Sequence, residues 1–207
     1  MNFPTRLFYP VLLISLMLFG CTVTLVQPYD AELYKNTEAF YKKAATMILK
    51  GENSSPTAQQ LANITPKAAS DNPGHFSKFK TDYDELLVDS NALILRSLAN
   101  SGKVDDIGKQ AQAKIEDLIR GNISTACETA QQDFPSVDLT TRNYIDLKCL
   151  VTKWKNEHQG VGGTDASDGK QILKKANWEG RERTLFDSIL AIQSAEAFKN
   201  KTKGESK

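Results

Sequence analysis

The sequence predicts an all-α protein, built as an antiparallel helical bundle with short accessory helices. From Tyr29 onward, apolar residues recur at the spacing of one helix face, and no segment shows the alternation of a half-buried strand. Capping residues and glycines mark the expected ends of the helices. Several helices with short connections pack most simply as antiparallel neighbours.

The first long helix is predicted from Asp30 to about Lys50. Asp30 is its expected cap or first-turn acid, and Gly51 follows the last turn as a stop. The apolar face of this helix consists of Leu33, Thr37, Phe40, Ala44 and Met47.

The stretch 51–75 is rich in Ser, Asn, Pro and Gly, and it is predicted to contain the accessory helices. Ser55-Pro56 and Thr65-Pro66 each resemble a capping residue followed by proline at the first helical position. Leu61 and Ile64 offer apolar anchors, so short helical turns are expected here.

The remaining chain has the same helical spacing. Gln159 to Gly169 is interpreted as a loop, because it is rich in glycine and aspartate. Gly180 is a candidate bend, since glycine weakens a helix interior by roughly 1 kcal/mol relative to alanine. The further predicted helices cover 76–100, 104–120, a short stretch at 124–132, 138–158 and 170–200.

The first residues have the proportions of a signal peptide. Arg6 gives a short basic start, and the apolar run from Leu7 to Phe19 falls short of the about 20 residues that a transmembrane helix needs. The junction Leu18-Phe19-Gly20-Cys21 resembles a lipobox, the processing site of bacterial lipoproteins. The opening from Cys21 through a polar linker to Tyr29-Asp30, followed directly by a helix, is similar to that of small proteobacterial outer-membrane lipoproteins. A spanning anchor is the alternative, because Val23 to Val26 extends the apolar character.

The resemblance implies cleavage before Cys21 and a membrane anchor on that cysteine. Two or three acyl chains, such as palmitate, give stable anchoring where a single chain is reversible. Thr22 follows the cysteine where an aspartate would favour the inner membrane, so the periplasmic face of the outer membrane is expected. An inner-membrane anchor is the alternative location.

These features divide the chain into four parts. Residues 1–20 are the expected signal peptide, 21–29 the lipidated tether, 30–202 a single bundle domain and 203–207 a polar, disordered tail. Removing Arg6 from the 26 basic residues leaves 25, which balance the 25 acidic residues. A balanced chain has no long-range field for polyanions, so nucleic acid is not an expected partner.

The other two cysteines, Cys127 and Cys149, are expected to form a disulfide in an oxidising periplasm. Such a bridge contributes about 3 kcal/mol in the chain-entropy model. Two buried thiols are the alternative. The spacing does not match the Cys-x-x-Cys of a redox pair.

Motifs for phosphate, calcium and zinc sites fail on spacing. Five residues separate Gly163 from Gly169-Lys170, where a phosphate loop has four. Lys170 occupies the glycine position of a calcium loop that starts at Asp165. His75 and His158 lack the neighbouring ligands of a zinc site, so both are interpreted as surface or capping residues. No catalytic residue, metal or cofactor is therefore predicted.

Two further groups have alternative interpretations. Asp82, Glu85 and Asp89 share a helical face and are interpreted as a solvated acidic stripe. Trp154 and Trp178 flank the last predicted loop, and core packing explains them most simply. A ligand or saccharide platform at these two indoles is the speculative alternative.

The sequence therefore favours a non-enzymatic lipoprotein that serves as an adaptor, assembly factor or binding partner of other envelope proteins. An exposed apolar patch on one helix face would favour this hypothesis. The alternative is a bundle that binds a small apolar or saccharide ligand, which calls for a closed pocket. A hydrolase ranks third.

Overall fold

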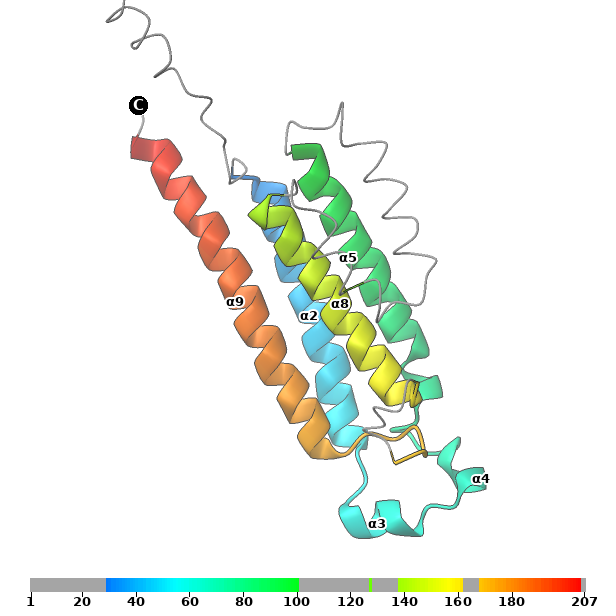
Figure 1. The fold of residues 1–207 in the computed structure, drawn as a ribbon. Helices are drawn as coiled ribbons and strands as arrows, with labels where there is room; N and C mark the ends of the chain where they lie inside the picture. Colours follow the sequence, from blue (N-terminus) through cyan, green and yellow to red (C-terminus); the bar gives the residue numbers. More distant parts are fainter. Residues whose placement is uncertain (1–28, 101–126, 128–137, 162–167, 206–207) are drawn as a thin grey trace, which may run out of the picture.

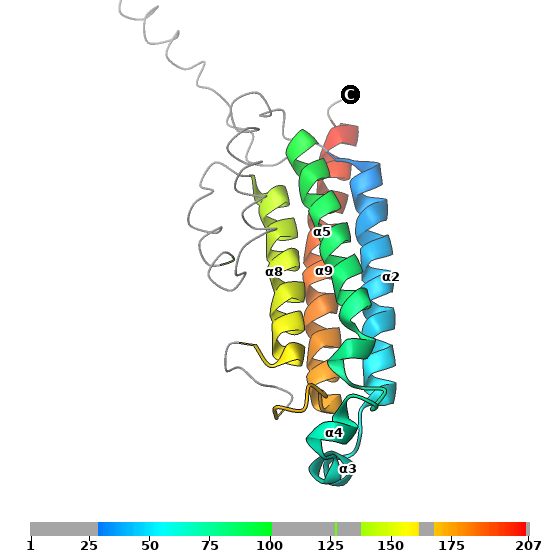
Figure 2. The same ribbon diagram turned by 90° about the vertical axis from the view of Figure 1, so that its right-hand side faces the viewer.

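The computed structural model describes residues 29–100, 127, 138–161 and 168–205. These residues contain four long helices: α2 (Ala31–Ser54), α5 (Lys80–Asn100), α8 (Leu139–Gln159) and α9 (Lys175–Glu205). Along the chain they alternate in direction and lie side by side (Figures 1 and 2). The predicted all-α antiparallel bundle is confirmed. The segments predicted as helices at 104–120 and 124–132 lie outside the described residues, apart from residue 127.

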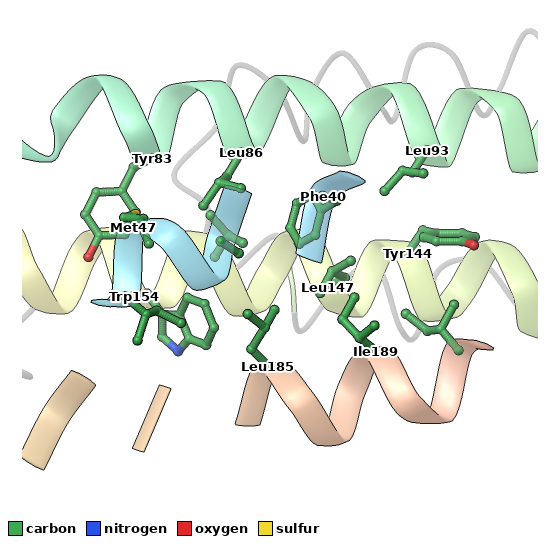
Figure 3. Packing of buried hydrophobic residues seen from close by; sticks show 14 of the residues in the cluster. Phe40, Met47, Tyr83, Leu86, Leu93, Tyr144, Leu147, Trp154, Leu185 and Ile189 are labelled. Atoms are coloured by element: carbon green, nitrogen blue, oxygen red, sulfur yellow. The ribbon is translucent and has the colours of Figure 1, made fainter. Parts of the chain in front are cut away.

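The bundle packs around α2, which lies between α5 and α9, while α5 packs against α8. Figure 3 shows side chains from all four helices meeting in one core. Its largest fully buried members include Trp178, Tyr83, Tyr144, Phe40 and Phe79. The buried face of α9 recurs every three or four residues, as helix packing requires, and comprises Trp178, Arg181, Leu185, Ile189, Ile192, Glu196 and Lys199.

Helix α2 begins as predicted but continues past its expected stop. Asp30 caps it, and the carboxylate oxygen Oδ1 accepts hydrogen bonds from the backbone N–H groups of Glu32 (2.9 Å) and Leu33 (3.2 Å). Gly51 lies inside the helix, and a Cβ there would stand 2.3 Å from the indole of Trp178. The glycine therefore permits close approach of α2 and α9, and it does not end α2.

The accessory helices α3 (Ala58–Asn63) and α4 (Pro66–Ala69) lie beyond the end of α2 (Figure 1). The Thr65-Pro66 start is confirmed for α4, but α3 is capped by Thr57 and not by Ser55. Thr57 and Gln60 form a capping box, which explains the later start. Leu61 and Ala69 pack with Ile172 in a small second core.

The predicted helix 76–100 is divided in two by a tertiary contact. A 3-10 turn, η2 (Phe76–Lys78), precedes α5. The backbone N–H of Phe76 donates to the carbonyl of Gln171 at 2.8 Å, which holds this turn against a distant loop. Helix α8 agrees with the prediction, with Asp138 as its N-cap and Gly160 in the left-handed region after its end.

The last helix starts later and ends later than predicted. Asp168 and Gln171 have positive φ angles of 52° and 56°, which a helix does not accommodate, so α9 starts at Lys175 and not at residue 170. At the other end α9 includes 203–205, which were predicted to belong to the polar tail. The helix continues through Gly180, its candidate bend.

Candidate functional site

The two tryptophans singled out by the sequence lie beside the same buried cation. The guanidinium carbon of Arg181 stands 5.8 Å from the ring centroid of Trp154 and 4.9 Å from that of Trp178. Trp154 is 4% exposed and Trp178 is 0% exposed. The structure therefore places both indoles in the core, and neither presents an open face to a saccharide.

Arg181 also begins a chain of hydrogen bonds that links α9, α5 and α8. Its Nη1 donates to the hydroxyl of Tyr83 at 2.5 Å, and this hydroxyl lies 3.1 Å from Nδ1 of His158. Nε2 of His158 lies 3.1 Å from the carbonyl oxygen of Gly74. A carbonyl only accepts, so Nε2 carries the proton and Nδ1 accepts from Tyr83.

Burial fixes the protonation states of this network. Desolvation, aided by the charge of Arg181, lowers the pKa of His158 to about 3. Desolvation also raises the pKa of Tyr83 to about 12, despite the opposing effect of Arg181. At neutral pH the imidazole is therefore uncharged and the phenol is protonated.

The guanidinium of Arg181 also has two hydrogen-bond acceptors on α8. Its Nη2 donates to the backbone oxygen of Trp154 at 2.8 Å and lies 3.4 Å from Oε2 of Glu157. Both ring nitrogens of His158 and the hydroxyl of Tyr83 are already engaged by protein atoms. This arrangement acts as a clamp between three helices, which we call the Arg181 clamp (Arg181, Tyr83, His158 and Gly74).

The prediction for His158 as a surface or capping residue is wrong, because its side chain is completely buried. A sequence signal was present: Leu147, Val151, Trp154 and His158 follow one another at helical spacing on one face. The prediction for His75 is confirmed, since its side chain caps η2 by accepting from the backbone N–H of Ser77 at 3.2 Å.

Two polar contacts fix how α5 and α8 lie against each other. Oγ of Ser97 and Oγ1 of Thr141 are 2.7 Å apart, and Nζ of Lys155 lies 2.6 Å from Oδ1 of Asp84. In an antiparallel pair the numbers of facing residues have a nearly constant sum, here 238 or 239 (97 + 141 and 84 + 155). This register places Asn91 opposite Lys148.

Sequence reasoning missed Lys148, which is only 4% exposed. Within the described part of the chain, its ammonium, Oδ1 of Asn91 and Oγ1 of Thr152 are buried polar atoms without a hydrogen-bond partner. Burial lowers the pKa of Lys148. The interface between α5 and α8 thus contains a buried amine that forms no ion pair with a carboxylate of the described residues.

The acidic stripe of α5 forms salt bridges with lysines of α2. Nζ of Lys43 lies 2.8 Å from Oδ2 of Asp89, and Nζ of Lys50 lies 2.7 Å from Oδ2 of Asp82. All four side chains are at least one-third exposed, so these pairs orient α2 against α5 and contribute little to stability.

The predicted disulfide is present: the sulfur atoms of Cys127 and Cys149 are 2.01 Å apart, and their Cα atoms are 5.6 Å apart. Cys21 lies outside the described residues. Among the residues that are described, no helix is long and apolar enough to cross a membrane. The same residues contain no group of three side chains suited to a metal ion.

Together these features define an antiparallel helical bundle closed by the Arg181 clamp and bridged by one described disulfide. No family model matches the chain, and no curated protein or solved structure matches it either.

Proposed function

We propose that the chain is a lipid-anchored envelope protein, whose bundle is a non-catalytic adaptor or binding partner for other envelope proteins. The distribution of its three cysteines carries this proposal. Cys127 and Cys149 bond to each other, as is usual in an oxidising compartment. Cys21 is left over, and it stands where a lipobox has its acylated residue.

The start of the bundle fits a short tether. Helix α2 begins at Ala31, directly after the proposed tether 21–29. Nε and Nη2 of Arg96 donate to the two carboxylate oxygens of Asp30 at 2.7 and 2.9 Å. Asn100 also donates to Asp30, so the point where the tether enters the bundle is held by the end of α5.

An exposed apolar pair supports the binding role. Phe186 and Leu190 of α9 are 53% and 51% exposed, and they lie one turn apart on one helix face. Exposed apolar groups on a helix face favour contact with a protein partner. The alternative, a small ligand held at Trp154 and Trp178, receives no such support because both indoles are buried.

Membrane fractionation of the protein in a Gram-negative host tests the anchor. Wild type should be found with the outer membrane, and Cys21→Ala should not. Thr22→Asp is the matched control for sorting: it keeps the acylated cysteine and should move the protein to the inner membrane. If wild type and Cys21→Ala both stay with the inner membrane and retain residues 1–20, the segment is a spanning anchor and the proposal is wrong.

A photo-crosslinking side chain at position 190 tests the binding role in the same host. Its matched control is position 191, which is also exposed but points in a different direction around α9. Defined protein adducts at 190 that are absent at 191 support a partner on this face. Identical adduct patterns at both positions contradict it.

A further inference from the structure

One end of the bundle, which we call the proximal end, brings together the start of α2, the end of α5 and the start of α8. Nζ of Lys199 donates to Oγ1 of Thr140 at 2.6 Å, which places this part of α9 beside the start of α8. Asp30 is bonded to Arg96 and Asn100, which places the start of α2 beside the end of α5.

Phe198 of α9 lies level with this end. Gly51 touches Trp178, and α2 and α9 run in opposite directions. Ala31 is 20 residues before Gly51 (51 − 31), and Phe198 is 20 residues after Trp178 (198 − 178), so both lie about 30 Å along their helices. Beyond this level α9 continues to Glu205, and its C-terminal end extends past the start of α2 (Figures 1 and 2).

The proximal end carries large exposed apolar side chains. Phe198 is 68% exposed and Leu139, the first residue of α8, is 55% exposed. Leu95, which is 54% exposed, lies between one and two turns from the end of α5. Exposed apolar side chains at one end of a lipid-anchored domain gain free energy when they enter the boundary between headgroups and acyl chains.

The length of the tether limits how far this end is from the bilayer. Eight residue steps join Cys21 to Tyr29, and a fully extended chain spans at most about 3.6 Å per residue, or about 29 Å in all. The 24 residues of α2 span roughly 36 Å. The proximal end is therefore kept near the membrane, and α3 and α4 lie at the opposite end of the bundle.

We infer that the proximal end, through Phe198 and Leu139, sits in the phospholipid headgroup region of the bilayer that holds acylated Cys21. The bundle then stands on its end, and α3 and α4 point away from the membrane. This inference rests on the lipid anchor of the proposed function.

Tryptophan quenching by brominated lipids tests this orientation in the acylated full-length protein. The vesicles contain phosphatidylethanolamine and phosphatidylglycerol with bromine on the acyl chains close to the headgroup. Phe198→Trp reports on the proximal end and Leu49→Trp, near the far end of α2, is the matched control. Phe186→Trp reports on the side of α9, about 18 Å below Phe198. The native tryptophans are buried and give the same background in every variant.

The inference predicts strong quenching of Phe198→Trp, with Leu49→Trp and Phe186→Trp no more quenched than wild type. If position 186 is quenched as strongly as position 198, the bundle lies on its side. If position 198 is not quenched, the proximal end stays clear of the lipid. Either result overturns the inference. Intact mass of the same samples separates the two proposals. A chain without acyl groups removes the proposed anchor and the inference with it, whereas an acylated chain without quenching at 198 removes the inference alone.

Discussion

The amine of Lys148 is buried at the interface of α5 and α8. The helical spacing of apolar residues in the sequence does not predict a charged residue at this position. A buried polar group without a partner costs about 1–3 kcal/mol. We expect Lys148→Met to raise the free energy of unfolding by an amount in this range, because methionine keeps the apolar part of the side chain. Urea unfolding measures the change, and Lys153→Met is the control, since the Lys153 side chain is 71% exposed.

The same variant should alter the pH dependence of stability. Because the folded protein lowers the pKa of Lys148 from 10.5, the unfolded chain binds more protons between the lowered value and 10.5. Wild-type stability therefore gains a positive contribution as pH rises through that window. Lys148→Met should lack this contribution. A variant less stable than wild type at neutral pH would show that the ammonium has a stabilising partner.

Two glycines in helices should respond in opposite ways to alanine. A Cβ at Gly51 would overlap the indole of Trp178, whereas a Cβ at Gly180 meets nothing within 4 Å. We expect Gly51→Ala to lower the free energy of unfolding by about 1–3 kcal/mol through overpacking. Gly180→Ala should raise it by about 0.5–1 kcal/mol, because alanine favours a helix interior. Equal effects in thermal unfolding would contradict the close contact between α2 and α9.

At the residue level, the sequence predicts which side chains are buried more readily than it predicts which side chains contact one another. The apolar faces of α2 and α8 follow directly from helical spacing, and so does the burial of Trp154 and Trp178. The roles of Gly51, His158 and Lys148 depend on which residue stands opposite on another helix. That register is a property of the folded molecule, so local patterns do not contain it.

At the scale of elements, Asp30 has two roles: it caps α2 locally, and it forms an ion pair with Arg96 of α5. The hydrogen bonds from Arg96 are the largest cause that lowers the pKa of Asp30, from 3.8 to about 2. Because the pKa of Asp30 is lower in the folded protein, the ionised carboxylate stabilises the fold above about pH 4. This contribution to the free energy of unfolding is lost as the pH falls toward 2. We expect Asp30→Asn, which keeps a good capping residue, to lose stability at neutral pH and to lack this acid-dependent decrease.

Circular dichroism during thermal unfolding, at intervals between pH 7 and pH 2, measures this difference. Asp187→Asn on the exposed face of α9 is the control, and it should follow wild type. Identical pH profiles for wild type and Asp30→Asn would contradict the role of the Arg96–Asp30 pair.

Elements were predictable where their ends are set locally. Asp138 and Gly160 bracket α8, and Thr65-Pro66 starts α4, because caps act on neighbouring residues. The start of α9 was not predictable in this way. The helical spacing of the following residues predicts that 170–174 belong to the same helix. Ile172 instead forms a β-bridge with His75 and packs against Leu61. A tertiary contact overrides the helical tendency there.

At the scale of the whole molecule, the fold class follows from the sequence because a helical bundle is made of local structure. The proposed function, in contrast, depends on single cysteines. Cys127 and Cys149 are joined to each other, and Cys21 precedes Tyr29, the first residue described, by eight positions in the sequence. The proposed function therefore requires a disulfide between Cys127 and Cys149 and a lipid on Cys21.

Intact-mass measurement under non-reducing conditions, followed by mapping of the cysteine peptides, tests this claim most directly. The account predicts a mature chain that starts at Cys21 and carries acyl groups on that residue, with Cys127 and Cys149 in one linked pair of peptides. A chain that retains Met1 and has no lipid, or a disulfide that involves Cys21, would contradict it.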